Sequence, residues 1–230
     1  MKKLLLSLVF FSLLIVSADE NNEVESIEEP KIELTKPSFS INQKNLKIYM
    51  TGEKMKMNQN GIVELTNVLS KFGSESKKSE ITADFAFYNK DKEVIGFKNS
   101  VNFNFITNKS LAHLKTESLK INLANKMVKS DSESNLDLNE SQIISKGFQY
   151  NFNEELEPYL KFIKGEFKDK RDSENYGIAD NLKIIDKNKI LLEGNALFTQ
   201  KGLRIEADSI YYDYLEKKII KSINAKVTST

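Results

Sequence analysis

Side chains that could carry out chemistry are few in this chain. His113 is the only histidine among 230 residues, and there is no cysteine. Zinc sites built from several histidines or from thiolates, disulfides and thiol catalysis are therefore excluded, and a Ser-His-Asp triad is disfavoured. Ala112 and Leu114 flank His113 and share the opposite strand phase, so we expect His113 to point outward. No glycine-rich phosphate loop is present. We predict no enzymatic activity, no cofactor and no metal.

Acidic residues recur at wide and regular intervals. They are Glu53, Asp84, Glu117, Asp180 and Asp208, with Gly147 at the equivalent place in one further copy. Paired carboxylates would suit glycoside hydrolysis, and clustered ones would suit calcium. Because each acid occurs once per repeat, the acids should be spread along the molecule. We therefore expect these acids near turns or in a ladder of polar side chains along the stacked strands. The alternative, in which they are catalytic, would be an envelope hydrolase.

The elements that position these acids have the pattern of β-hairpins. Residues 205–220 alternate apolar and polar side chains around a short polar turn, with β-branched and aromatic residues prominent. The same pattern returns at 178–198 and 81–103, with a period of roughly 31 residues that is typical of repeat proteins. One hairpin cannot bury its own apolar face, so stacked copies must share a core. We predict an all-β fold, an open β-jellyroll in which a twisted antiparallel sheet of stacked hairpins is folded over on itself.

Composition limits the classes of partner. The 34 basic and 33 acidic residues leave a net charge of +1, which argues against an electrostatic nucleic-acid binder. Only Arg171 and Arg204 are arginines, so bidentate phosphate clamps are scarce.

The N-terminus has the pattern of an export signal. Two lysines precede an apolar run that extends from Leu4 to Val16, and small residues follow up to Ala18. We predict that residues 1–18 are a signal peptide, or a short inner-membrane anchor helix if the segment is retained. Residues 19–36 are rich in glutamate and should form a flexible acidic linker. The protein is therefore predicted to reach the periplasm, with a possible tether to the inner membrane.

Two parts of the chain resemble known periplasmic families. Residues 178–227 carry Ala179-Asp180, Gly194-Asn195-Ala196 and Ala207-Asp208, which resemble the OstA-like repeat of LptA-type proteins. The signal, linker and looser repeats of 37–170 resemble the LptC family. The charged loop at 168–175 would then separate an LptC-like body, 37–170, from OstA-like hairpins, 176–230, that continue the jellyroll.

This resemblance implies a periplasmic component of lipopolysaccharide export, or of the export of a related glycolipid. Such a component would accept lipid from an inner-membrane ABC transporter permease. It would pass the lipid to an LptA-like bridge protein or an outer-membrane translocon. The alternative is a structural or adhesive envelope β-solenoid without cargo, which would have a filled interior.

An incompletely filled interior would form an apolar groove for acyl chains. The same residues could instead simply pack the core. The candidate lining residues are Phe85, Phe87, Val101, Phe103, Phe105, Leu119, Ile121, Leu123, Phe148, Tyr150, Leu182, Ile184, Leu192, Phe198, Ile210 and Tyr212.

An open jellyroll also ends in unpaired strands, which can add strands of a partner. We expect these edges near residues 39–49 and 219–227. The candidate partner contacts are Phe39, Ile41, Leu46, Ile48, Ile220, Ile223 and Val227.

Overall fold

The computed structural model describes residues 32–43, 46–73, 79–107, 110–138, 140–152, 160–186 and 188–229. Within these ranges the chain is all β, and its strands form one large antiparallel sheet, as the sequence predicts. The predicted signal, 1–18, lies outside the described residues. Ile32–Thr35, which the sequence assigns to the acidic linker, forms strand β1 instead. The described residues include no helix with the length and apolar character needed to span a membrane.

The sheet is folded lengthwise into two layers, which we call layer A and layer B. Layer A contains β1 (Ile32–Thr35), β4 (Lys54–Met57), β9 (Met127–Ser130), β12 (Gly147–Asn151) and β17 (Lys218–Ile223). Layer B contains β2 (Ser38–Gln43), β3 (Leu46–Thr51), β10 (Ser134–Leu138), β11 (Ser141–Ser145) and β18 (Lys226–Ser229). The long strands contribute one half to each layer; they are β5 (Val63–Phe72), β6 (Ser79–Asn89), β7 (Val94–Thr107), β8 (Ser110–Asn122), β13 (Leu160–Asp169), β14 (Tyr176–Asp186), β15 (Lys189–Gln200) and β16 (Leu203–Asp213).

Strand pairing shows how the long strands join the two layers. Residues 63–66 of β5 pair with β4 in layer A, whereas residues 69–72 pair with β3 in layer B. At the other end of the molecule, β16 pairs with β17 through residues 209–213 and with β18 through residues 203–206. Each long strand therefore bends once. We call the line of bends the corner, and the opposite side, where the hairpin tips of the two layers face each other, the mouth.

The predicted acids lie along the corner. Four of them accept a hydrogen bond from an asparagine or serine of the next bent strand. These pairs are Glu53–Asn67 at 2.5 Å, Asp84–Ser100 at 3.1 Å, Asp180–Asn195 at 2.7 Å and Asp208–Asn224 at 2.5 Å. The donor residues have φ between 45° and 53°, the left-handed region that asparagine tolerates better than most residues. The ladder role predicted from the sequence is confirmed for these four acids.

Hydroxyl groups replace the acid–amide pairs where β8 meets β9. Glu117 lies at this part of the corner, but its neighbours make the contacts there. Thr116 Oγ1 lies 2.9 Å from Ser130 Oγ, and Ser118 Oγ lies 2.7 Å from Ser132 Oγ. The repeat period of roughly 31 residues thus corresponds to one hairpin of two bent strands, with one polar contact per hairpin at the corner.

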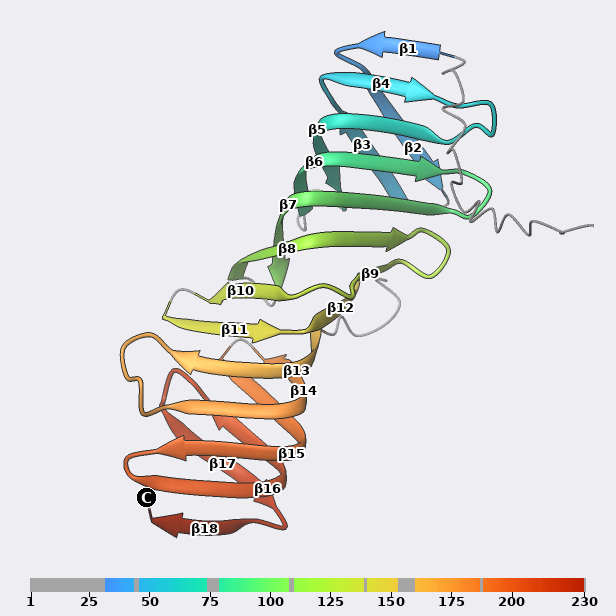
Figure 1. Ribbon diagram of the computed structural model, residues 1–230. Helices are drawn as coiled ribbons and strands as arrows, with labels where there is room; N and C mark the ends of the chain where they lie inside the picture. The colour runs from blue at the N-terminus through green and yellow to red at the C-terminus, as the bar shows by residue number, and fades with distance from the viewer. Residues whose placement is uncertain are drawn as a thin grey trace, which may run out of the picture.

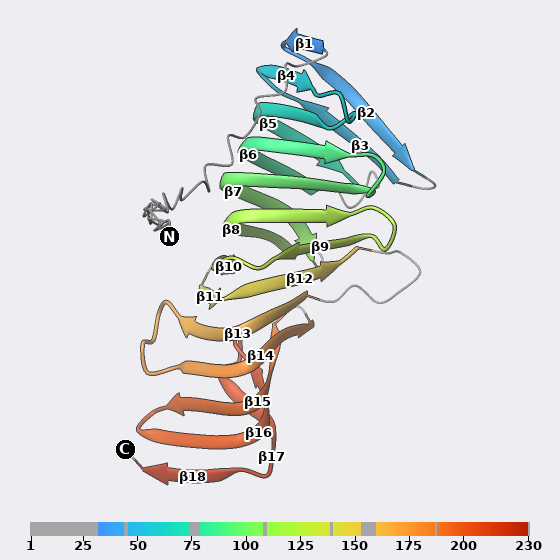
Figure 2. The same ribbon diagram turned by 45° about the vertical axis from the view of Figure 1, so that its right-hand side comes forward.

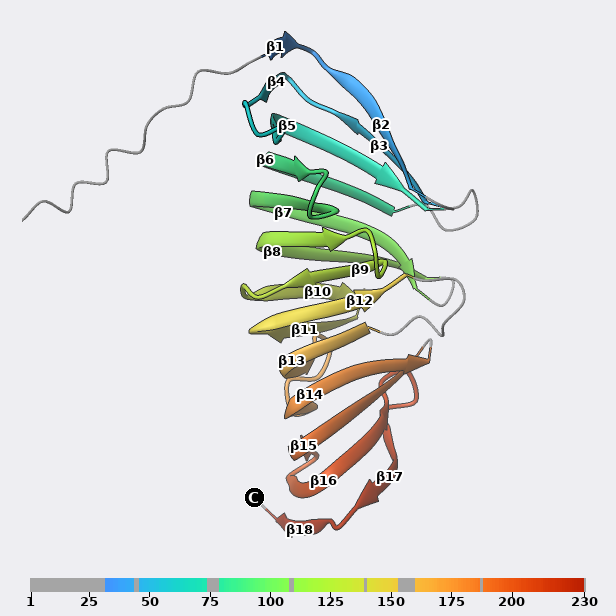
Figure 3. The ribbon, with the colours of Figure 1, turned by 90° about the vertical axis from the view of Figure 1, so that its right-hand side faces the viewer.

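The folded sheet also twists along its length. In Figure 1, β1 and β4 of layer A lie in front at the top, whereas β17 of the same layer lies behind at the bottom. Figures 2 and 3 show the same elongated stack from the side, with β1 at one end and β18 at the other. The sheet twists because each strand of L-amino acids has a right-handed twist about its own axis, and these twists add up along the stack.

The sheet is continuous across the charged loop at 168–175. β13 pairs with β14 from Leu160–Ile184 to Lys168–Tyr176, and the connection between them is the turn at 170–175. The predicted boundary between the two parts of the chain therefore falls in a hairpin turn of one sheet.

Candidate functional site

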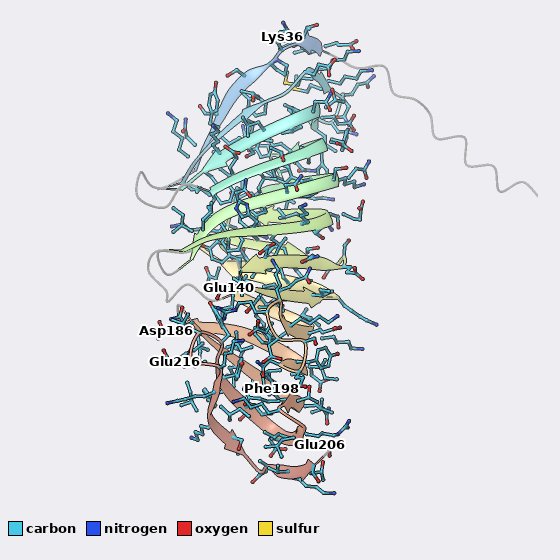
Figure 4. All side chains as sticks on the ribbon, turned by 90° about the vertical axis from the view of Figure 1, so that its left-hand side faces the viewer. Lys36, Glu140, Asp186, Phe198, Glu206 and Glu216 are labelled. Atoms are coloured by element: carbon cyan, nitrogen blue, oxygen red, sulfur yellow. The ribbon has the colours of Figure 1, made fainter. Side chains whose placement is uncertain are left out.

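The space between the layers is lined by apolar side chains from both of them. All but two of the residues predicted to line a groove are buried in this interior. They are Val101, Phe103, Phe105, Leu119, Ile121, Leu123, Phe148, Tyr150, Leu182, Ile184, Leu192, Phe198, Ile210 and Tyr212. In Figure 4, Phe198 lies between the layers, while Asp186 and Glu216 at hairpin tips lie on the side opposite to Glu206, which is close to the corner.

Phe85 and Phe87 are the two exceptions, because β6 changes phase at the corner. The pairing of β6 with β7 shifts between Thr82 and Phe85, and Ala86 takes the fully buried inward position. Phe85 and Phe87 then lie on the outer face. The Phe87 ring covers Gly96 on the neighbouring strand, where a Cβ atom would lie 2.1 Å from the ring. These two residues do not line the interior, and the β-bulge at Asp84 is the reason.

Aromatic rings fill much of the interior. Phe103 stacks on Phe105 with centroids 4.4 Å apart, and it lies 6.1 Å from Phe72 and 6.4 Å from Phe148. A second group, Phe167, Phe198 and Tyr212, occupies the C-terminal half, with the Phe198 and Tyr212 centroids 4.4 Å apart. The protein's own side chains therefore pack against one another here.

Several interior aromatics were not among the predicted lining residues. They are Phe72, Phe97, Phe162 and Phe167, all buried. The alternation of apolar and polar residues along each strand identifies them, provided that inward and outward positions are exchanged where the strand crosses the corner.

The two halves of the mouth differ in chemistry. In the N-terminal half, Phe72 of layer B meets Phe152 of layer A at a centroid distance of 5.4 Å, and Phe105 meets Tyr150 at 4.9 Å. In the C-terminal half, polar groups meet across the mouth: Lys217 Nζ lies 3.2 Å from Asp169 Oδ2. The first half thus has an apolar rim, and the second has a polar one.

Burial changes the ionisation of the interior tyrosines. Burial raises the pKa of Tyr150 above its ordinary value of 10.0. Burial, together with the charges of Asp213 and Asp186, raises the pKa of Tyr214 to about 12. Burial is also the main reason why the pKa of Tyr212 is raised, with a further contribution from the charge of Asp169. All three phenols are neutral near pH 7 and add no charge to the interior there.

The apolar inward face reaches solvent at both ends of the molecule. At the N-terminal end, Leu34 lies opposite Met55, which lies opposite the fully buried Leu65. Directly opposed residues share one face of a sheet, so Leu34 belongs to the interior face although its side chain is 47% exposed.

The C-terminal end repeats this arrangement. Val227, 56% exposed, lies opposite Ile205, and Ile205 lies opposite the fully buried Phe198. The interior therefore opens onto solvent at each end of the part of the chain that the structure describes.

The predicted partner contacts are divided between edge and interior. Phe39 and Ile41 lie on β2, and Ile220, Ile223 and Val227 lie on β17 and β18; these are terminal strands of their layers within the described ranges. Leu46 and Ile48 lie on β3, which pairs with both β2 and β5. Leu46 and Ile48 therefore do not lie on an edge strand. Both are buried in the core, as is Ile41 on the edge strand β2.

Side chains that could hold a metal ion do not come together in the described ranges. No cluster of three or more histidine, cysteine, aspartate or glutamate side chains occurs there. His113 is exposed, as its phase predicts, and its Nδ1 lies 2.6 Å from Asn104 Oδ1 on the outer face.

Comparison with known proteins gives one family. The model of the family described as "Lipopolysaccharide-assembly, LptC-related" matches residues 4–157. The match covers more than half of the chain and agrees with the resemblance noted for its N-terminal part. No curated protein matches the chain.

Proposed function

Because the chain belongs to the LptC-related lipopolysaccharide-assembly family, we propose that it carries the acyl chains of lipopolysaccharide in the apolar interior between layers A and B. As a member of this family, the chain has a role in lipopolysaccharide transport, as a transport component of the periplasm associated with the inner membrane.

One observation supports this proposal best: the apolar inward face is continuous and is open at both ends. It extends from Leu34 on β1, through fully buried residues such as Ile121 and Leu182, to Val227 on β18. Moving an acyl chain of about twelve carbons into water costs roughly 10 kcal/mol at ~0.8 kcal/mol per methylene. A carrier that crosses the periplasm must offer such a chain apolar surface throughout, and this face does so.

Cargo would have to displace contacts that the protein makes with itself. The interior is packed by rings such as Phe103 and Phe105, so acyl chains can enter only if the layers separate at the mouth. The apolar N-terminal half, rimmed by Phe72 and Phe152, is the natural place of entry.

The packed interior also favours a second candidate function, a structural β-solenoid of the envelope without cargo. The two candidates differ in whether lipid reaches the interior side chains. A lipid-carrying protein must bring acyl chains within contact distance of the mouth residues, whereas a structural solenoid must keep them outside.

Photo-crosslinking from Phe152 tests the proposal. With a photoreactive phenylalanine analogue at Phe152, illumination with lipopolysaccharide should give a covalent lipid adduct, because this ring lies at the apolar mouth. Phe85 is the matched control, since it is also a partly buried phenylalanine but faces outward from β6. We expect an adduct at Phe152 and little or none at Phe85, detected as a mass shift on a denaturing gel. Equal adducts at the two positions, or none at Phe152, would favour the structural solenoid.

We further propose that the two ends have different partners. The β1 and β2 end would face the periplasmic domains of the transporter permease, and the β17 and β18 end would receive the LptA-like bridge protein through main-chain hydrogen bonds. In support, β17 and β18 present the exposed apolar residues Ile220, Ile223 and Val227.

Crosslinking from Val227 in cells checks this assignment of ends. A photoreactive residue at Val227 should give an adduct with the bridge protein, whereas one at Leu34, at the opposite end, should not. An adduct with the bridge protein from Leu34 and none from Val227 would reverse the proposed direction.

A further inference from the structure

Lys217 makes three polar contacts that join layers A and B across the mouth in the C-terminal half. This residue lies in the turn between β16 and β17, at a hairpin tip of layer A. Its Nζ lies 3.2 Å from Asp169 Oδ2 and 4.0 Å from Asp172 Oδ2, both at the β13–β14 tip of layer B. Its backbone oxygen accepts a hydrogen bond of 2.8 Å from Gln200 Nε2, at the layer B end of β15.

The carboxylate in this group is well shielded from solvent. The Asp169 side chain is 0% exposed and the Lys217 side chain 32% exposed. Arg171 Nε lies 3.8 Å from Asp169 Oδ1, and the Arg171 backbone N–H donates to the same oxygen at 2.8 Å. A buried carboxylate is stable only where it is paired, so Asp169 favours the arrangement in which the two layers are held together.

The group lies next to the second aromatic group of the interior. Phe167 is two residues before Asp169 on the same buried face of β13, and its ring centroid lies 5.5 Å from that of Tyr212. Tyr212 in turn packs on Phe198 across the two layers. Ion pairs elsewhere, such as Lys71–Glu80 and Lys183–Glu193, join neighbouring strands within one layer and do not have this geometry.

We infer that Lys217, Asp169 and Gln200 form a latch that holds the C-terminal half of the mouth shut, and that acyl chains reach this half of the interior only after the latch opens. The inference rests on the proposed function. Lipid whose headgroup remains in water must pass along the mouth with its acyl chains inside. A contact that spans the mouth blocks that path, whereas the apolar contact between Phe72 and Phe152 in the other half can be replaced by acyl chains.

A covalent bridge across the mouth tests the latch. The chain has no cysteine of its own, so Asp169→Cys together with Lys217→Cys provides a unique pair that a short bismaleimide can join. Photoreactive residues at Leu192, in the C-terminal interior, and at Phe152, at the N-terminal mouth, report where lipopolysaccharide acyl chains reach. Bridging should lower the yield of lipid adduct at Leu192 by at least about tenfold, because the open state is removed, and should leave that at Phe152 within about twofold.

Two further variants control this experiment. A bridge between Asp186→Cys and Lys189→Cys joins an exposed pair within one turn of layer A and should leave the adduct at Leu192 unchanged. Lys217→Met removes the ammonium group and keeps the stem, so it should raise the adduct yield at Leu192 by at least about twofold, since it shifts the equilibrium toward the open mouth.

The outcomes separate the two proposals. Equal adduct yields at Leu192 with and without the bridge across the mouth, or no rise in Lys217→Met, would overturn the latch. Absence of an adduct at Phe152 in the unbridged protein would overturn the proposed function itself.

Discussion

Replacing Phe103 with alanine should lower the free energy of unfolding by about 3–5 kcal/mol, as is usual for a fully buried phenylalanine. Phe103 is 0% exposed, stacks on Phe105 and lies within 6.4 Å of the Phe148 and Tyr150 ring centroids. The variant loses the transfer free energy of the ring and leaves a cavity that its rigid aromatic neighbours cannot fill. The chain has no tryptophan, so urea unfolding followed by circular dichroism is the suitable measurement.

The matched control is Phe85→Ala, which removes the same ring from the outer face. Phe85 is only partly buried and lies outside the core cluster, so we expect a loss of about 1 kcal/mol or less. If Phe103→Ala cost no more than Phe85→Ala, the interior would be a loosely filled trough and not a packed core. A permanent cavity would then be present in the interior, and acyl chains could enter it without any separation of the layers.

The repeat could be predicted because its signals are local. The acids at Asp84, Asp180 and Asp208 recur at an even spacing, and the strands around them alternate clearly. Together these features predict stacked hairpins with one polar position per repeat, and the structure places those positions along one corner. The polar partners at the corner, such as Asn195 and Asn224, were not predicted, because they lie on the following strand.

The inward phase of each strand was harder to predict because it reverses at the corner. In β14, Ala179 and Leu182 are both buried although they lie on either side of Asp180. In β6, Ala83 and Ala86 flank Asp84 in the same way, so Phe85 and Phe87 face outward. A simple alternation carried through the acid assigns these two rings to the wrong face. The acid itself marks the place where the alternation must be restarted.

The contacts across the mouth could not be predicted from the sequence at all. Asp169 and Lys217 are far apart in the chain. Asp169 ends β13 and Lys217 lies in the turn between β16 and β17, and charged residues at hairpin tips are usually solvated. Folding brings their tips together because the sheet is bent at every corner, and the bend angle depends on packing between layers. Long-range polar pairs of this kind have no local sequence signal.

Raising the pH from about 9 to about 11.5 should destabilise the C-terminal half through Tyr212 and Tyr214. Burial raises the pKa of Tyr214 from 10.0 to about 12, and burial raises that of Tyr212 as well. The unfolded chain releases these protons first, so the stabilisation is complete below about pH 10 and is lost as the pH rises through the folded pKa. For Tyr214 this difference in pKa between the folded and unfolded chain corresponds to at most about 2.7 kcal/mol of stability, reduced to about 1–2 kcal/mol because its ring is partly exposed.

Phenylalanine variants isolate this effect from the loss of lysine charge over the same pH range. The Tyr212→Phe/Tyr214→Phe variant keeps the rings and removes both ionisations, so its unfolding free energy should fall less between about pH 9 and about pH 11.5 than that of the wild type. At pH 8, Tyr212→Phe alone should be as stable as the wild type or more stable by about 1 kcal/mol, because the buried Tyr212 hydroxyl has no hydrogen-bond partner among the described residues. An equal loss with pH in both proteins would mean that these phenols reach water in the folded state. The C-terminal half of the interior would then be open without any release of Lys217 from Asp169, which contradicts the latch as well.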